Sequence, residues 1–437
     1  MQPRFSVVVP TCDRANLLHH TLRALLAIDR DDIEIVVSDN ASKDDTQAVI
    51  SEFKSDKRLV AARADNRMSM PDHWNFASSH SSGEWIIVNG DDDGLSPSIF
   101  NYLSAAIGTL KPRLLSWHSG LYHHPDYKVE GTPNTLYLTA GHSRLAAVLD
   151  PRCVIERYAG FDFDYFPEGT RFCVARELAA AVIKRTGRFF WPTCPDFSAP
   201  LLCLCEISSG DYVYLDAALS FGGRSAQSNA AAFLTGGDKA RVESYFNEFQ
   251  KTDVYPFHEP KLPFYYNGHA AALSLATQFY SLPGIEIDQA FLYRTMFEES
   301  KGIRYNPLIT QTVVGELERY IEGIEFSQRK IIDEVRRDVD KRIGSDHSDN
   351  KLEKLRNSIT QELRKKIKGL LLRRYANQFR TRPHKIELRG FENGFDLSSR
   401  WDEVLEVEDP FTTERIDKMI ETGLLLSAHN LSKAMSA

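Results

Sequence analysis

The stretch GEWIIVNGDDDGLSP, residues 83–97, decides the fold that this sequence predicts. Its apolar run, residues 85–88, is typical of a short buried strand, and a Gly-x-Ser-Pro turn leads from its end to a helix. Between them stand Asp91, Asp92 and Asp93. Carboxylates this close repel one another unless they are protonated or share a cation, and a hard divalent metal prefers oxygen ligands. The stretch therefore predicts a metal site at a strand end, with a solvated acidic turn as the alternative.

The residues before this stretch alternate between strand and helix patterns. Strands are expected at residues 5–9, 33–38 and 59–64, and helices at residues 15–28, 42–53 and 74–79. Such alternation calls for a parallel sheet with helices on both faces, and ligands bind beyond the carboxyl ends of its strands. Pro10, Thr11, Asp39 and the acidic triplet all stand at those ends. We therefore expect them to converge on one crevice.

Composition excludes several classes of protein. The chain has 437 residues, 42% hydrophobic and 26% charged, which is typical of a soluble globular protein of two or three domains. Its formal net charge of -7 argues against a general nucleic-acid binder. The 6 cysteines lack metal-site or disulfide spacing, no signal peptide precedes the first strand, and no apolar run reaches the ~20 residues of a membrane-spanning helix. We expect a cytoplasmic protein, with any membrane contact peripheral on the inner face.

The motifs along this alternation resemble those of family 2 glycosyltransferases of GT-A fold. The resemblance covers residues 1–225, and its motifs occur in the family's order. They are VVPT (8–11), SDNASKDDT (38–46), Asn66 with HWN (73–75), SGEWI (82–86), and GDDD (90–93) with Pro97. Two positions depart from the family pattern: many relatives carry Asp where this chain has Gly90, and Arg where it has Trp74. The first departure leaves open which two of the three acids face a metal.

The resemblance implies a nucleotide-sugar site and a divalent ion. Thr11 and Asp39 would hold the nucleoside, since a carboxylate can accept the imide N–H of uracil; helix capping is the alternative role of Asp39. The acids Asp91, Asp92 and Asp93 would bind Mn²⁺ or Mg²⁺, which would neutralise charge on a departing diphosphate. The residues assigned to the nucleotide sugar are Pro10, Thr11, Arg14, Asp39, Asn66, Asn75, Asp91, Asp92 and Arg224.

Two residues further along complete the expected site. Asp196 stands at the start of an apolar helix, where relatives carry the Glu-Asp pair that supplies the general base. Its aromatic neighbours would raise its pKa and improve it as a proton acceptor; an N-cap aspartate is the alternative. Arg224 lies in a Gly-Gly-Arg stretch that could close over the diphosphate as a mobile loop, or be an ordinary surface loop.

The second half of the chain differs in character. We expect a GT-A domain at residues 1–230, a helical connecting or acceptor region at 231–310, and an amphipathic helical region at 311–437. Apolar residues recur at helical spacing in residues 312–343 and 351–382, and the second of these segments is strongly basic. The pair favours a helical hairpin or homo-oligomer contact through residues 312–382, and a peripheral contact of residues 351–382 with an anionic membrane is the alternative.

The function expected from these observations is sugar transfer. The chain would be an inverting, metal-dependent glycosyltransferase that moves a sugar from a nucleotide diphosphate donor, a UDP-sugar, to a hydroxyl of a glycan or lipid-linked glycan. Bacterial surface glycan synthesis is the expected setting by family analogy. Two alternatives stay open: a catalytically inactive glycan-binding scaffold, and a sugar-phosphate nucleotidyltransferase. The second usually has a Gly-rich loop after its first strand, and residues 10–14 contain no glycine.

Overall fold

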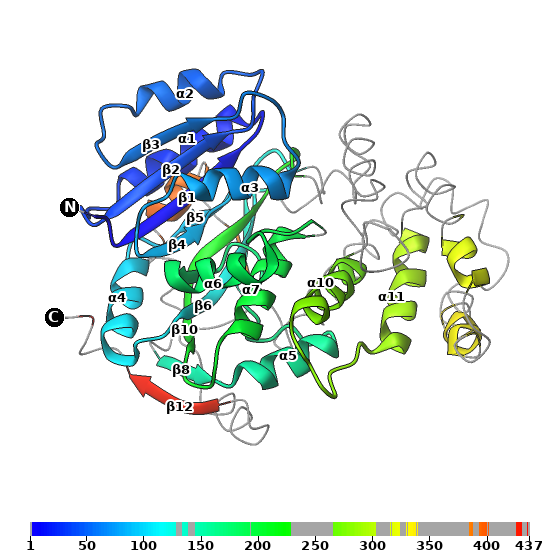
Figure 1. The fold of residues 1–437 in the computed structure, drawn as a ribbon. Coiled ribbons are helices and arrows are strands. Elements are labelled where there is room, and N and C mark those ends of the chain that lie inside the picture. Colours follow the sequence, from blue (N-terminus) through cyan, green and yellow to red (C-terminus); the bar gives the residue numbers. More distant parts are fainter. Residues whose placement is uncertain are drawn as a thin grey trace, which may run out of the picture.

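The computed structural model describes residues 2–127, 133–138, 145–192, 194–228 and 265–302, and parts of 315–339, 384–401 and 425–435. Within these residues the chain forms one mixed sheet flanked by helices (Figure 1). The sheet has the order β12-β8-β10-β6-β9-β4-β1-β2-β3, and β5, β7 and β11 pair off this path. The predicted α/β architecture with a helical C-terminal region is confirmed.

The first part of the chain follows the expected alternation. Its elements are β1 (Phe5–Thr11), α1 (Ala15–Leu26), β2 (Ile33–Asp39), α2 (Thr46–Glu52), β3 (Leu59–Arg63), α3 (Met70–Ser79), β4 (Trp85–Val88), β5 (Gly94–Leu95) and α4 (Ile99–Leu110). Helix α3 begins before the expected residue 74, because Ser69 accepts the N–H of Asp72 as N-cap and Pro71 suits the first turn.

The middle of the chain extends the sheet and covers it. Its elements are β6 (Leu114–His123), β7 (Thr135–Leu138), β8 (Leu145–Leu149), α5 (Pro151–Ala159), β9 (Phe172–Ala175), α6 (Arg176–Thr186), α7 (Pro195–Glu206) and β10 (Tyr212–Arg224). Strand β10 runs on to Arg224, so the Gly-Gly-Arg stretch is part of a strand. The expectation of a mobile loop there is wrong, because Gly222 and Gly223 pair with Leu121 and Tyr122 of β6.

The C-terminal part contributes both helices and strands. Its elements are α10 (Tyr265–Phe279), α11 (Gln289–Gly302), β11 (His384–Glu387), α15 (Gly394–Ser399) and β12 (Leu425–Asn430). Figure 1 shows α10 beside α7 and α11 beside α10, so that these helices extend outward from the sheet in succession. Strands β11 and β12 pair with β7 and β8, which the sequence did not predict.

The predicted division of the chain at residues 230 and 310 stays a prediction. Residues 317–323 and 331–337 are helical, as expected for part of the first amphipathic segment. The basic segment 351–382 lies outside the described residues. Among the described helices, none is long and apolar enough to cross a membrane.

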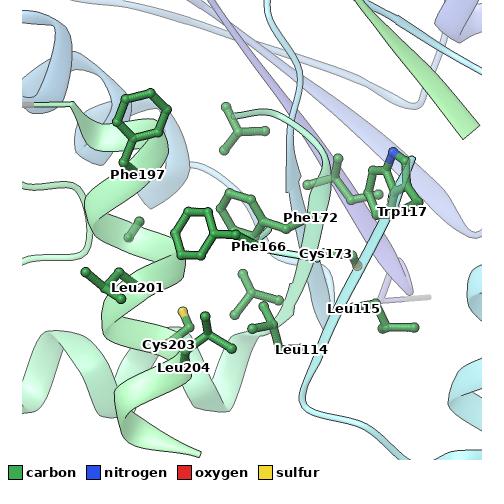
Figure 2. Close-up of a cluster of buried hydrophobic side chains, with 14 of the residues drawn as sticks. Leu114, Leu115, Trp117, Phe166, Phe172, Cys173, Phe197, Leu201, Cys203 and Leu204 are labelled. Carbon is green, nitrogen blue, oxygen red and sulfur yellow. The ribbon is translucent and has the colours of Figure 1, made fainter. Parts of the chain in front are cut away.

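The core fixes the sheet against helix α7. Figure 2 shows Phe197, Leu201 and Leu204 of α7 beside Phe166 and Phe172, all in one buried cluster. Burying side chains of this size contributes about 1.5–3 kcal/mol each, so the start of α7 is held firmly against the sheet. The packing matters for the expected site because Asp196 stands at that start.

A second, smaller core lies behind the acidic turn. Trp401, 1% exposed, packs with Tyr122, Phe221 and Leu397 and donates its Nε1–H to the carbonyl of Ala218 (2.8 Å). Residues close to the C-terminus thus support the end of β10.

Candidate active site

The carboxyl ends of β1, β2 and β4 meet at one edge of the sheet. β1 lies between β2 and β4 and is parallel to both, with Thr11 opposite Asp39. The Thr11 hydroxyl donates to Asp91 Oδ2 (2.7 Å), and the amide of Asn40 donates to the Thr11 carbonyl (3.0 Å). The structure therefore brings the predicted strand ends together, because parallel strands end on the same side.

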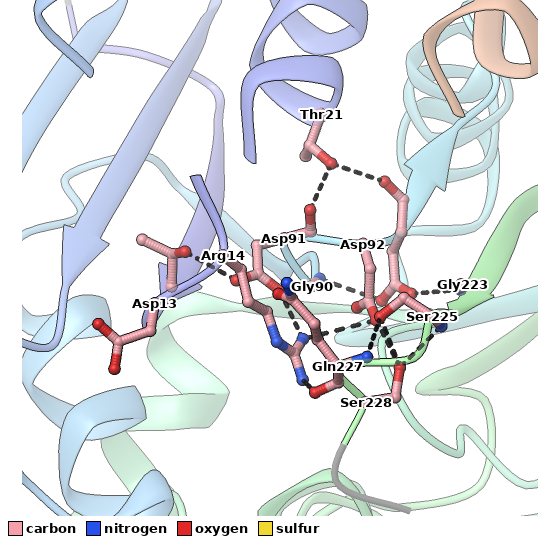
Figure 3. Close-up of polar contacts among 12 residues, drawn as sticks. Asp13, Arg14, Thr21, Gly90, Asp91, Asp92, Gly223, Ser225, Gln227 and Ser228 are labelled. Atoms are coloured by element: carbon pink, nitrogen blue, oxygen red, sulfur yellow. Dashed lines mark hydrogen bonds and ion pairs between the residues drawn. The ribbon is translucent and has the colours of Figure 1, made fainter. Parts of the chain in front are cut away.

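The three acids of the triplet form different hydrogen bonds. Asp91 Oδ1 accepts from Arg14 (2.8 Å), and Asp92 Oδ2 accepts from Ser228 (2.9 Å), as Figure 3 shows. Asp93 folds back and accepts the amides of Gly90 (3.1 Å) and Gly223 (2.8 Å). In the described part of the chain, no group of three His, Cys, Asp or Glu side chains is placed to share a metal ion.

The fold-back of Asp93 brings its carboxylate close to Gly90. A Cβ at Gly90 would lie 2.6 Å from Asp93 Oδ2, so a side chain at residue 90 would require the Asp93 carboxylate to turn away. The departure from the family pattern at residue 90 thus goes together with this orientation of Asp93. They leave Asp91 and Asp92 as the acids with a common partner.

That common partner is Arg14, which stands just before helix α1. Its Nη1 lies 2.8 Å from Asp91 Oδ1 and 3.5 Å from Asp92 Oδ2, and its Nη2 donates to the Gln227 carbonyl (2.9 Å). The guanidinium is thus the positive charge that lies between the two carboxylates (Figure 3). It also ties residues 225–228, which follow β10, to the acids.

One guanidinium does not neutralise three carboxylates, of which Asp91 and Asp92 are buried and Asp93 is half-buried. Burial raises the pKa of Asp91, although Arg14 acts in the opposite direction, and burial with the charge of Asp92 raises the pKa of Asp93 to about 7. Excess negative charge in a low-dielectric site shifts carboxyl groups toward the protonated form. The cluster therefore lowers its negative charge either by protonation or by sharing a cation.

β10 closes the cluster from one side. A Cβ at Gly223 would lie 1.8 Å from the carbonyl oxygen of Asp92, so only glycine fits. His124, which follows β6, donates from Nε2 to the same carbonyl (2.8 Å). Sequence reasoning left His124 outside the site, and its separation from Asp92 along the chain gave no signal of this contact.

Asp39 is fully buried and engaged by its own neighbourhood. Its carboxylate accepts the amide of Ser42 (2.8 Å) and the side chains of Gln47 (2.6 Å) and Arg63 (2.8 Å). These bonds hold the turn before α2, but the N-cap of that helix is Asp45, so Asp39 does not cap it. The contact with a nucleoside stays a prediction.

Three other predicted site residues have distinct environments. Asn66 is exposed after β3. Asn75 donates to the carbonyls of Pro71 and Phe190 and accepts the amides of Phe189 and Phe190, so its amide holds that segment. Its contact with a nucleotide stays a prediction. Arg224 has Tyr127, Tyr265 and Glu168 as its electrostatic neighbours, and its contact with a diphosphate stays a prediction.

Asp196 begins helix α7 and lies within electrostatic range of the triplet. Burial is the main cause that raises its pKa to about 7, followed by the charge of Glu168, with a smaller effect of Asp93. Thr170, close to Glu168 in the chain, donates to Asp93 Oδ2 (2.7 Å). Sequence reasoning missed Glu168 and Thr170, because they stand in an irregular segment without a motif.

Part of the chain is similar in sequence to known glycosyltransferases. Residues 6–109 match the family described as Glycosyl transferase family 2. A curated protein of Campylobacter jejuni, GalNAc(5)-diNAcBac-PP-undecaprenol beta-1,3-glucosyltransferase, is 27% identical over 166 residues, which are 38% of this chain and 52% of that protein. The match thus spans about half the length of the relative.

Similar solved structures cover more of the chain. S. aureus TarS 1-349 in complex with UDP-GlcNAc has a TM-score of 0.42 and 12% identity, over 77% of this chain and 80% of that one. Mannosyltransferase PcManGT from Pyrobaculum calidifontis, in complex with GDP-Man and Mn²⁺, has a TM-score of 0.35 and 19% identity, over 74% and 89%.

Proposed function

Because the chain carries a glycosyl transferase family 2 domain at residues 6–109, we propose that it is an inverting glycosyltransferase with a nucleotide diphosphate sugar, a UDP-sugar, as donor. The observation that carries this proposal is the meeting of Thr11, Arg14 and the acidic triplet at one sheet edge, with Asp196 in electrostatic range. Sugar transfer to a hydroxyl requires a polar site that binds the nucleotide-sugar donor and a base that accepts the hydroxyl proton.

Two acids of the triplet suit a divalent metal. Asp91 and Asp92 already share one cation, the Arg14 guanidinium, and carboxylate oxygens suit Mn²⁺ or Mg²⁺. These two acids would hold the ion, with Asp93 turned toward Gly90 and Gly223. When bound, the ion would supply charge neutralisation to the diphosphate leaving group. Arg14, released from the acids, would then be available to the donor phosphates.

The chemical step is a single displacement. The acceptor oxygen forms a bond to the anomeric carbon from the face opposite the diphosphate, and the bond from that carbon to the phosphate oxygen breaks. Its electron pair leaves with the diphosphate, and the hydroxyl proton passes to Asp196. A pKa of about 7 suits Asp196 to this task, because a base near the working pH is both deprotonated and able to hold the proton.

The acceptor we propose is a lipid-linked glycan in bacterial surface glycan synthesis. The name of the Campylobacter relative specifies a glycan on undecaprenol diphosphate. Such an acceptor would place the enzyme in the cytoplasm at the inner face of the membrane, in peripheral contact through residues 351–382. Self-association through residues 312–382 is the rival use of that region.

The proposal is tested by donor binding and transfer. Purified protein is melted with a panel of nucleotide sugars, with and without Mn²⁺, because a ligand that binds only the folded state raises the melting temperature. Transfer from the stabilising donor to lipid-linked glycans is then measured for wild type, Asp92→Ala, Asp196→Asn and the control Asp31→Asn. Asp31 is exposed at the amino end of β2, on the opposite sheet edge.

The outcomes separate the functions. We expect Asp31→Asn to transfer sugar like wild type, Asp92→Ala to lose metal-dependent stabilisation, and Asp196→Asn to bind donor but transfer it at least 100-fold more slowly, as general-base loss predicts. Transfer that survives both substitutions rejects the site. A wild type whose melting temperature no nucleotide sugar raises, and which transfers no sugar, favours the scaffold. Release of diphosphate from a nucleoside triphosphate and a sugar phosphate favours nucleotidyl transfer.

A further inference from the structure

A proline inside helix α7 leaves one backbone acceptor open. Pro200 has no N–H, so the carbonyl four residues earlier, that of Asp196, has no donor within the helix. The amide of Gly169 donates to this carbonyl instead (3.1 Å). The segment 168–171 is thus anchored to the first turn of α7 at Asp196 itself.

The same segment is anchored to the acidic triplet. Gly169 adopts a φ of +69°, a left-handed conformation that glycine takes without strain. The chain turns there, and the next residue, Thr170, donates its hydroxyl to Asp93 Oδ2 (2.7 Å). Residues 168–171 therefore connect Asp196 to Asp93 through two hydrogen bonds.

Glu168, the first residue of this segment, is held by two partners. Arg171 Nη2 lies 2.7 Å from its Oε2, with both side chains about five-sixths buried at 16% and 15% exposure. The hydroxyl of Tyr265 in α10 donates to its Oε1. The Tyr265 ring also packs edge-on against Phe197, the residue after Asp196 (ring centroids 5.5 Å apart). The carboxylate of Glu168 is therefore fixed beside the start of α7.

We propose that Glu168 is a positioning residue for the transfer reaction, a second carboxylate that Arg171 and Tyr265 fix in the segment anchored to Asp196, so that Asp196 retains a proton it has accepted. This inference rests on the proposed function, in which Asp196 takes the proton of the acceptor hydroxyl. A negative neighbour disfavours the ionised form of a carboxyl group and strengthens it as a base. Glu168 itself contacts no reacting atom in this scheme.

The electrostatics of Asp196 agree with this assignment. After burial, the charge of Glu168 is the largest cause that raises its pKa. The other titratable groups that face Asp196 among the described residues are Asp93, Cys194 and Tyr158. Burial raises the pKa of the Cys194 thiol and the Tyr158 hydroxyl well above their ordinary values, so both are neutral at pH 7.

The test follows the titration of Asp196 directly. Protein with carboxyl-¹³C aspartate is titrated by NMR, and the Asp196 signal is identified by its loss in Asp196→Asn. Glu168→Gln removes the charge and keeps the size, and Glu168→Asp keeps the charge. Glu156→Gln is the control: Glu156 is a surface residue of α5 paired with Arg152. Thermal melts establish that each variant is folded.

We expect Glu168→Gln to bring the pKa of Asp196 below about 7 but not to 3.8, because burial remains. Glu168→Asp and Glu156→Gln should leave it near the wild-type value, and the acid limb of the pH profile of kcat should shift only in Glu168→Gln. An unchanged pKa in Glu168→Gln overturns the inference, as does an equal shift in Glu156→Gln. If Glu168→Gln does not fold, Glu168→Asp decides: a pKa that falls despite the retained charge overturns the inference.

The titration needs no turnover, so the two proposals fail separately. If the wild type transfers no sugar to any acceptor but Glu168→Gln moves the Asp196 titration, the pairing stands and the proposed function falls. If Asp196→Asn abolishes transfer while Glu168→Gln leaves the titration unchanged, the function stands and Glu168 has no positioning role.

Discussion

Replacing Gly223 by Ala should disrupt the acid cluster, whereas the same change at the adjacent Gly222 should not. A Cβ at residue 223 would lie 1.8 Å from the Asp92 carbonyl oxygen and 2.7 Å from His124 Nε2, where real Cβ atoms keep at least 3.0 Å. The obstacle is backbone, so β10 must move away from Asp92 by more than 1 Å (3.0 − 1.8 = 1.2 Å). At Gly222 a Cβ meets only Asp93 Oδ1, at 3.9 Å.

The cost of the Gly223 change follows from two effects. Overpacking costs about 1–3 kcal/mol, and loss of the Gly223 amide bond to the Asp93 carboxylate costs about 1.5–3 kcal/mol more. We therefore expect a loss of roughly 2.5–6 kcal/mol in the free energy of unfolding. Gly222→Ala should stay within about 1 kcal/mol of wild type, since it replaces a strand glycine without a clash.

Chemical denaturation and donor binding measure the two expectations. Urea unfolding gives the free-energy difference, and the Mn²⁺-dependent shift in melting temperature with a nucleotide sugar reports the acid cluster. Gly223→Ala should unfold at lower urea and lose the metal-dependent shift, while Gly222→Ala keeps both. Equal stability and equal donor response of the two variants would refute the close approach of β10 to Asp92.

Three further expectations concern charge and backbone. The pKa of Asp196 is raised from 3.8 to about 7, so the folded state binds a proton that the unfolded state has already lost in this range. As the pH rises from 4 to 7, the stability of the wild type should therefore fall by up to about 4 kcal/mol relative to Asp196→Asn, measured by melts at a series of pH values. Asp56→Asn, at a carboxyl group whose pKa its bond to Arg58 lowers, should leave that slope unchanged. Arg14→Ala leaves Asp91 buried without its ion-pair partner and should cost about 3–5 kcal/mol in urea unfolding, part of it recovered with Mn²⁺; no recovery would contradict metal binding by the pair. Gly169→Ala should lose about 1–2 kcal/mol through its positive φ alone, whereas Gly108→Ala in α4 should gain about 0.5–1 kcal/mol, and a neutral Gly169→Ala would argue against the left-handed turn.

Local patterns in the sequence determine the elements that carry the first half of the site. Apolar runs before Thr11, Asp39 and Asp91 fix three parallel strands, and parallel strands must end at one edge. The meeting of these residues was therefore predictable from the chain alone. The start of α7 at Pro195 was equally readable, because proline followed by an acid suits a first helical turn.

The partners of the acids were not predictable in the same way. Glu168, Thr170, His124 and Ser228 stand in irregular segments, and each reaches the site through packing between distant parts of the chain. The end of β10 was expected as a loop because two glycines favour turns. Only the paired neighbour β6, and a backbone that leaves no space for a Cβ, make it a strand.

By itself, the sequence determined which residues stand at the strand ends and that three carboxylates are adjacent, since both depend on short-range order. Tertiary structure decided how these carboxylates are shared: Asp91 and Asp92 with Arg14, and Asp93 with Gly90, Gly223 and Thr170. It also decided that the Asp196 carbonyl, left open by Pro200, accepts the amide of Gly169 and so anchors the segment of Glu168 to the first turn of α7. The physical reason is that charge and hydrogen-bond partners are chosen by proximity in space, which sequence separation does not specify.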